Sequence, residues 1–196
     1  MKRIAAAVFL FFLTASPGFA ALVNPDFEDG LNGWDTFKSD SRTTVSTLLY
    51  DVDGDGTSSS ASWFFYVGSG TAGISQVVET LAGELTLSLD FAIDYSGSSG
   101  WSDTVNLLVD DSVIATASPG YFRNGEERRF VLSGSLNVDA GFHELKLAVI
   151  NAASPKYFYY LSDDWQMSIT AVPLPSAAWL LAGGMLGIVG IRKQRF

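Results

Sequence analysis

The chain has 196 residues, no cysteine and one histidine, and its 21 acidic residues outnumber its 12 basic residues to give a net charge of −9. Without cysteine it forms no disulfide, and a single histidine excludes a histidine-rich transition-metal site. All 21 acidic residues lie between the chain ends, where only seven basic residues lie, so the middle of the chain has a net charge of −14. This makes nucleic acid and anionic membranes poor partners, whereas calcium and neutral polysaccharide remain suitable ones.

The first 20 residues have the features of a secretory signal peptide. Lys2 and Arg3 form a positively charged start, residues 4–13 are apolar, and small residues precede a cleavage site between Ala20 and Ala21. The apolar run is too short for a stable membrane span. The sequence therefore predicts an exported protein whose mature chain begins at Ala21.

Residues 21–171 are sufficient for one domain with its own core, and they read as a series of strands. The clearest strand is 84–93, where large apolar residues alternate with polar or small ones. Further strand-like runs lie at 43–49, 62–67, 73–79, 104–109, 113–117, 128–132, 142–150 and 165–172. Gly, Ser, Asp and Pro separate these runs, and no amphipathic helical pattern occurs among them. The pattern predicts an all-β fold, a single antiparallel β-sandwich.

Three short segments resemble the jelly-roll carbohydrate-binding modules of the galactose-binding-like group. Residues 22–34 are similar to an Asn-Gly-x-Phe-Glu opening followed by a Trp, with Pro25 in place of the usual Gly. Residues 73–78 resemble an internal Ile-Ser-Gln strand, and residues 160–169 resemble a last strand that is entered through an Asp-Asp pair. The resemblance implies a jelly-roll sandwich with a carbohydrate-binding-like or adhesion-like role and no catalysis.

An acidic loop is one candidate calcium site. Asp51, Asp53 and Asp55 alternate in the D-x-D-x-D-G pattern that opens an EF-hand loop, in which alternate carboxylates converge on the ion. The twelfth position is Ser62 instead of glutamate, and no helix is expected on either side, so an EF-hand is rejected. Either a different calcium loop or a solvated turn remains.

A second calcium site is implied by the resemblance. The similar modules often hold a structural ion between their first and last strands, and the matching positions here are Asp26 and Glu28 with Asp163 or Asp164. An ion there would tie together the two ends of a domain that has no disulfide. The alternative is that these carboxylates are turn and cap residues.

Exposed aromatic side chains are candidate sugar platforms, because a pyranose has one apolar face and polar edges. Trp101 lies in a Ser/Gly-rich loop, residues 96–102, and Tyr121 with Phe122 follows Ser-Pro-Gly in another loop. Tyr157 and Tyr159 belong to a run of four aromatic residues. We expect the core to contain Trp34, Trp63 and Trp165.

Residues 172–196 are expected to form a membrane anchor. The segment opens with Val172, Pro173, Leu174 and Pro175, and the prolines end any preceding structure. Residues 176–191 carry no charge, so in lipid they can only be a helix, which would cover about 24 Å of the ~30 Å hydrocarbon core. The basic tail, 192–196, would stay in the cytoplasm. The alternative, a buried soluble helix, is weaker because the segment has no polar face.

This order of proline pair, short glycine-rich apolar helix and basic end resembles the PEP-CTERM sorting domain of exported Gram-negative proteins. Leu174 stands where that family usually has Glu. The resemblance implies an exosortase-type processing enzyme as a partner and an intermediate held in the inner membrane by its C-terminal helix. The final site would be the cell surface or the extracellular matrix, with exopolysaccharide as a further partner.

The leading hypothesis is thus an exported surface or matrix protein with a non-catalytic, carbohydrate-binding-like β-sandwich. The first alternative is a structural matrix component that binds no particular sugar. The second is an exported glycoside-active enzyme, although no Gly-x-Ser-x-Gly elbow, zinc spacing or phosphate loop occurs. His143 lies in a strand-like run with no visible partner, which favours a structural role.

Overall fold

The computed structural model describes residues 21–66, 70–95, 99–101, 104–118, 120–151 and 158–171. The expected signal peptide with Ala20, the sorting motif from Val172 to Pro175 and the expected membrane helix lie outside these residues. Within the described residues, no helix is long and apolar enough to cross a membrane.

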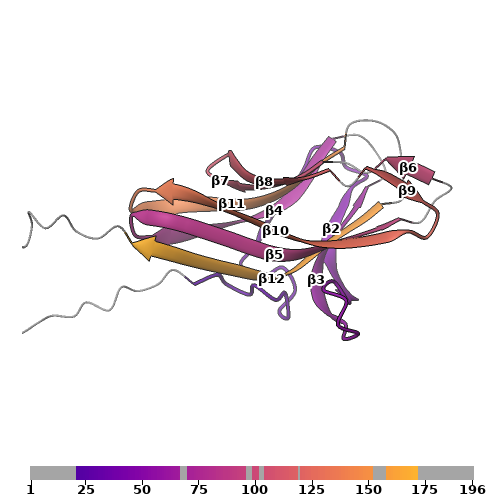
Figure 1. Ribbon diagram of the computed structural model, residues 1–196, viewed down its shortest axis with the longest axis horizontal. Coiled ribbons are helices and arrows are strands. Elements are labelled where there is room, and N and C mark those ends of the chain that lie inside the picture. Colours follow the sequence, from indigo (N-terminus) through magenta and orange to yellow (C-terminus); the bar gives the residue numbers. More distant parts are fainter. Residues whose placement is uncertain are drawn as a thin grey trace, which may run out of the picture.

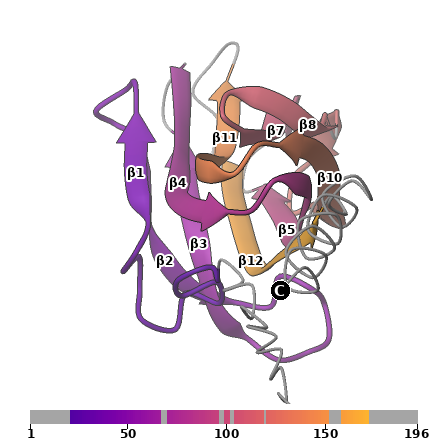
Figure 2. The same cartoon turned by 90° about the vertical axis from the view of Figure 1, so that its left-hand side faces the viewer.

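The described chain is built from strands alone, and every strand pairing is antiparallel (Figure 1). The first sheet has the order β1 (Asp35–Lys38), β4 (Gly70–Thr80), β11 (Gly141–Asn151), β7 (Thr104–Val109), β8 (Ser112–Ala117). The second sheet has the order β10 (Glu127–Val138), β5 (Gly83–Tyr95), β12 (Phe158–Ala171), β3 (Ser59–Tyr66), β2 (Thr44–Tyr50). A two-stranded ribbon joins β6 (Ser99–Trp101) to β9 (Tyr121–Arg123). The two large sheets face each other, which confirms the predicted antiparallel β-sandwich (Figure 2).

All nine predicted strands exist, and most extend further than the sequence pattern indicated. The sequence missed β1, β6 and β9, which are only three or four residues long. Trp101 and Tyr121 were expected in loops, but their backbones are paired with each other in the β6–β9 ribbon, so this expectation was wrong. A ribbon of this kind depends on a partner that is distant in the sequence, and its Ser/Gly-rich composition is typical of a loop.

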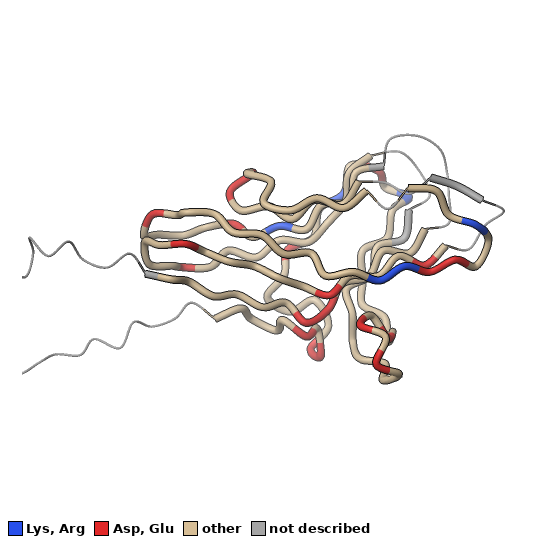
Figure 3. The backbone as a smooth tube through the Cα atoms, in the orientation of Figure 1, with Lys and Arg blue, Asp and Glu red and all other residues tan. Residues whose placement is uncertain are grey.

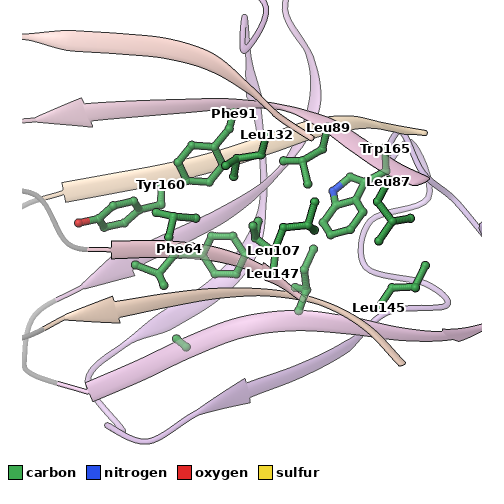
Figure 4. Close-up of a cluster of buried hydrophobic side chains, with 14 of the residues drawn as sticks. Phe64, Leu87, Leu89, Phe91, Leu107, Leu132, Leu145, Leu147, Tyr160 and Trp165 are labelled. Atoms are coloured by element: carbon green, nitrogen blue, oxygen red, sulfur yellow. The ribbon is translucent and has the colours of Figure 1, made fainter. Parts of the chain in front are cut away.

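The core lies between the two sheets. The alternation predicted for β5 is confirmed, because Leu85, Leu87, Leu89, Phe91 and Ile93 are almost completely buried. Figure 4 shows Leu87, Leu89 and Phe91 among side chains from both sheets. Burying one large apolar side chain contributes about 1.5–3 kcal/mol, so this layer is the main source of stability.

Two of the three tryptophans expected in the core are there. Trp34 and Trp165 are buried, and their ring centroids lie 4.7 Å apart. The side chain of Trp63 lies outside the described residues. Since the backbone N–H of Trp165 also donates to the Pro25 carbonyl at 3.3 Å, the first turn of the domain is fastened to its last strand.

The edge of the sandwich formed by β10 and β8 is closed by a close backbone contact. A Cβ atom at Gly134 of β10 would lie 2.3 Å from the carbonyl oxygen of Ile114 in β8. Only glycine allows this approach, because it has no side chain. The opposite edge of the second sheet, formed by β2, ends in a loop that reaches back across the sheet.

Candidate functional site

The connection between β2 and β3, residues 51–58, folds over the outer face of the second sheet. Val52 of this loop is 2% exposed and packs on Ala61, Ala92 and Leu161 in a second hydrophobic cluster. These strand residues belong to the face that an antiparallel sheet ordinarily turns to water. The loop therefore divides the outer face into separate compartments.

An arginine at the far edge of the sheet holds the loop in place. The Arg129 guanidinium of β10 donates to the Asp51 carbonyl from Nε at 3.1 Å and from Nη2 at 3.0 Å. The same Nη2 lies 3.8 Å from the Asp51 carboxylate and 2.7 Å from that of Glu127. Because β10 and β2 are the two edge strands of the sheet, these contacts span its full width.

Beside the loop lies a groove of about 330 Å³. Its lining residues come from β2, β5 and β12, and we call them the tyrosine groove: Leu48, Tyr50, Asp94, Tyr159 and Leu161. Tyr159 is directly opposite Asp94 in the β12–β5 register, so their side chains lie on the same face. Tyr159 was a predicted sugar platform, whereas the sequence analysis did not single out Tyr50, Asp94 or Leu48.

The polar groups of the tyrosine groove are partly shielded from water. Burial raises the pKa of the Tyr50 phenol well above its ordinary value, and the negative charges of Glu127 and Asp94 raise it further. Burial likewise raises the pKa of Asp94, partly opposed by a backbone hydrogen bond from Tyr95. Phenol rings, a carboxylate and hydroxyl groups in one groove are the groups that bind a pyranose.

On another side of the loop lies a smaller acidic pocket of about 140 Å³. The residues that line it are Asp26, Val52, Asp53, Asp55, Thr57, Ser59, Asp163 and Asp164. The two calcium sites expected from the sequence thus contribute to one pocket. Figure 3 shows the corresponding acidic segments close together below the sheets.

Asp163 is the most buried acidic residue of the pocket, at 2% exposed. Burial raises the pKa of its carboxyl to about 6, and the nearby charges of Asp164 and Asp26 act in the same direction. The Ser59 hydroxyl donates to one carboxylate oxygen and the Asp164 N–H donates to the other at 2.8 Å. Asp163 lies at the start of a β-bulge in β12, which turns this part of the strand away from regular pairing.

Asp51 belongs to the same acidic loop as Asp53 and Asp55 but does not line the pocket. Asp51, Asp53 and Asp55 have carboxylate oxygens within 4.8 Å of one another, a spacing that a metal ion could bridge. The Asp51 carboxylate accepts the N–H of Gly54 at 2.7 Å. Glu28 does not line the pocket, and it accepts the Ser60 N–H at 3.4 Å.

The remaining predicted platforms lie apart from the tyrosine groove. Tyr121 is 46% exposed and lines a hollow at the β6–β9 end of the sandwich, where the register pairs it with Trp101. Phe122 is fully buried, so its expected role as an exposed partner of Tyr121 is wrong. The side chain of Trp101 and the whole of Tyr157 lie outside the described residues.

Comparisons with known proteins identify the fold. No protein-family model matches the sequence, and the search of curated proteins finds no significant match. The structure of TmCBM61 in complex with β-1,4-galactotriose matches with a TM-score of 0.51 and 18% identity over 76% of this chain and 97% of that chain. The K1 cleaved adhesin domain of Lys-gingipain from Porphyromonas gingivalis W83 matches with a TM-score of 0.51 and 13% identity over 74% and 96% of the chains.

An arabinose-bound α-L-arabinofuranosidase, MgGH51, matches with a TM-score of 0.50 and 14% identity over 77% of this chain but only 26% of that enzyme. The similarity to the enzyme thus concerns a minor part of its length. At these identities the matches establish a shared architecture. The domain has the β-sandwich fold that is found in carbohydrate-binding modules.

Proposed function

We propose that the protein is an exported, non-catalytic carbohydrate-binding β-sandwich that holds a polysaccharide chain in the tyrosine groove. The observation that carries this proposal is the convergence of Tyr50, Tyr159 and Asp94 on one sheet face. Aromatic faces stack on the apolar side of a sugar ring, and the carboxylate accepts hydrogen bonds from its hydroxyl groups. The shared fold with carbohydrate-binding modules supports the same function.

The test compares binding of β-1,4-galactan and xylan by the wild type and by Tyr159→Ala. Loss of a stacking ring is expected to weaken binding by about tenfold, equivalent to about 1.4 kcal/mol. Phe142→Ala is the matched control, because Phe142 is a 73% exposed aromatic on the first sheet. Equal losses of affinity in the two variants would contradict binding in the tyrosine groove. A folded wild type that binds neither polymer would favour the alternative of a structural matrix component.

A glycoside-active enzyme is the second candidate, and one observation favours it. Asp94 and Glu127 are register partners on β5 and β10, so two carboxyl groups share one face of the sheet. A glycosidase needs two carboxyl groups about 5–10 Å apart, one of them with a raised pKa. Release of new reducing ends from β-1,4-galactan or xylan, lost in Asp94→Asn, would establish this activity and overturn the non-catalytic role.

We also propose that the acidic pocket holds a structural calcium ion. The donor set fits, since calcium prefers oxygen ligands and Asp26, Asp53, Asp55, Asp163 and Asp164 supply carboxylates around one pocket. These residues come from the first turn, the β2–β3 loop and the last strand. An ion bound there would join these three segments and offset the repulsion among their charges.

Export and sorting complete the proposal. The signal sequence ending at Ala20 and the motif from Val172 to Pro175 support secretion, membrane retention and release by an exosortase-type enzyme. Exopolysaccharide at the cell surface would then be the natural ligand. Intact mass of the protein recovered outside a Gram-negative host is expected to start at Ala21 and to end near the prolines. A full-length product in the medium would contradict the sorting step.

A further inference from the structure

We infer that the hollow at the β6–β9 end of the sandwich is a second binding site, specific for a sugar that carries a carboxylate group. The hollow has a volume of about 470 Å³. Its lining residues are Tyr121, Arg123, Asn124, Gly125, Glu126 and Arg128. It shares no lining residue with the tyrosine groove, so this inference goes beyond the function proposed above. Figure 3 shows basic segments at this end of an otherwise acidic domain.

The turn between β9 and β10 gives the hollow a defined shape. The Gly125 N–H donates to the Tyr95 carbonyl at 3.0 Å, and the Tyr95 N–H donates to the Glu126 carbonyl at 3.2 Å. Gly125 has a φ of 70°, which favours glycine because side chains crowd the backbone there. These bonds fix the turn against the end of β5 before any ligand binds.

Arg128 is also held in one place. Its guanidinium donates to Glu126 Oε1 at 3.0 Å from Nε and 2.6 Å from Nη2, and to the Tyr121 carbonyl at 2.7 Å. Its Cζ atom lies 4.3 Å from the centre of the Phe122 ring, within range of a cation–π contact. The Glu126 carboxylate therefore offsets the charge of Arg128 and orients its guanidinium.

Arg123 supplies the charge that remains. The second oxygen of Glu126, Oε2, accepts the backbone N–H of Arg123 at 2.8 Å, so both carboxylate oxygens already have partners. Among the described residues, no carboxylate lies within ion-pair distance of the Arg123 guanidinium. Two guanidinium groups and one carboxylate leave the hollow with one net positive charge, inside a domain with a net charge of −14.

A uronate unit of a polysaccharide fits this set of groups. The planar guanidinium of Arg123 matches a carboxylate through two parallel hydrogen bonds. The exposed ring of Tyr121 offers a face for the apolar side of the sugar, and the Asn124 amide offers both a donor and an acceptor for hydroxyl groups. A neutral sugar would leave the charge of Arg123 unmatched, so the site is expected to discriminate between the two.

The experiment measures binding of trigalacturonate and of its fully methyl-esterified form by calorimetry, without added divalent cations. The two probes share the same sugar chain and differ in the methyl groups that remove the charge of the carboxylates. The wild type is expected to bind the acid form about tenfold more tightly, and Arg123→Gln is expected to remove this preference. Arg42→Gln is the matched control, because Arg42 is exposed, pairs with Asp40 and does not line the hollow. Arg123→Lys is expected to retain only part of the preference, because the lysine ammonium lacks the two parallel N–H donors with which a guanidinium binds a carboxylate.

Equal affinity of the wild type for the two probes, or no binding of either, would overturn this inference. A preference that Arg123→Gln keeps would overturn it as well. Tyr159→Ala separates it from the proposed function, since this change is expected to weaken galactan binding and to leave the acid preference intact. A wild type that prefers trigalacturonate but binds no neutral polymer would refute sugar binding in the tyrosine groove and support the uronate site in the hollow.

Discussion

The outer face of the second sheet has two halves that are built from the same strands and differ in what covers them. In the open half, most of the side chains that line the surface are polar: Thr86, Ser88, Gln166 and Ser168, with Met167 beside them. In the covered half, Ala92 and Leu161 of the same strands are buried beneath Val52 of the β2–β3 loop. The β-bulge between Asp163 and Gln166 separates the two halves along β12.

The comparison teaches that both candidate sites of the second sheet lie where the loop packs on it. Alternation in β5 and β12 supplies an outward face in both halves. In the covered half the loop contributes lining residues to the acidic pocket, and its Val52 packs in one cluster with Tyr50 and Tyr159 of the tyrosine groove. The loop remains in place because Val52 is anchored in an apolar cluster and Arg129 binds the Asp51 carbonyl. A change beneath the loop should therefore affect both sites, and a change in the open half should affect neither.

The largest expected effect is that of Leu161→Ala. This change removes the apolar support of the loop and is expected to lower the free energy of unfolding by about 2–5 kcal/mol. Ser168→Ala, on the exposed open half of the same strand, is expected to change it by no more than about 0.5 kcal/mol. Urea unfolding of both variants measures the difference. Similar values for the two would mean that the loop does not stabilise the covered half.

Calcium should produce the next largest effect, because its ligands include loop residues. At an ion concentration of about 100 times Kd, binding stabilises a folded protein by about 2.7 kcal/mol, so the melting temperature should rise with calcium and fall with EDTA. Asp53→Asn is expected to abolish most of this response. Asp35→Asn, an exposed aspartate of β1, should leave it unchanged. If the melting temperature of the wild type does not respond to calcium, the proposed structural calcium site is refuted.

The smallest effect is expected away from the second sheet, at His143 of β11. Its Nδ1 lies 2.5 Å from Asp110 Oδ2 and its Nε2 lies 2.9 Å from the Asp139 carbonyl. The hydrogen bond with Asp110 raises the pKa of His143 above 6.5, and the Asp139 carbonyl adds to the shift. The pKa of His143 is thus higher in the folded protein than in the unfolded chain. The protonated His143 therefore stabilises the fold fully below pH 6.5, and this stabilisation is lost as pH rises through the folded pKa.

His143→Gln tests this pH dependence. The melting temperature of the wild type should exceed that of the variant at about pH 5, and the difference should shrink by about pH 9. Binding in the tyrosine groove should be the same for both proteins, because the histidine lies on the first sheet. A difference that grows with pH would contradict the assigned partners. The structure thus shows that Asp110 is the partner of His143, which the sequence did not indicate.

The strands and the core were predictable because their signal is local. The alternation of residues 84–93 already identifies the buried face of β5, and Trp34 and Trp165 are buried as expected. The candidate site was predictable only in part, since Tyr159 and the acidic residues could be named but not brought together. Tyr50 and Asp94 gave no such signal, although Tyr50 directly precedes the acidic loop and Asp94 occupies an outward position of β5. Their proximity depends on strands that pair across distant parts of the sequence.

The amino-acid sequence by itself determined the all-β class, the alternating core and the acidic character of the domain, because side-chain period and charge are properties of neighbouring residues. Tertiary structure alone decided that the β2–β3 loop crosses the second sheet, that Asp26 meets Asp53 and Asp163 in one pocket, and that Trp101 pairs with Tyr121. Those arrangements follow from strand order and burial, which join residues far apart in the chain and leave no periodic trace in it.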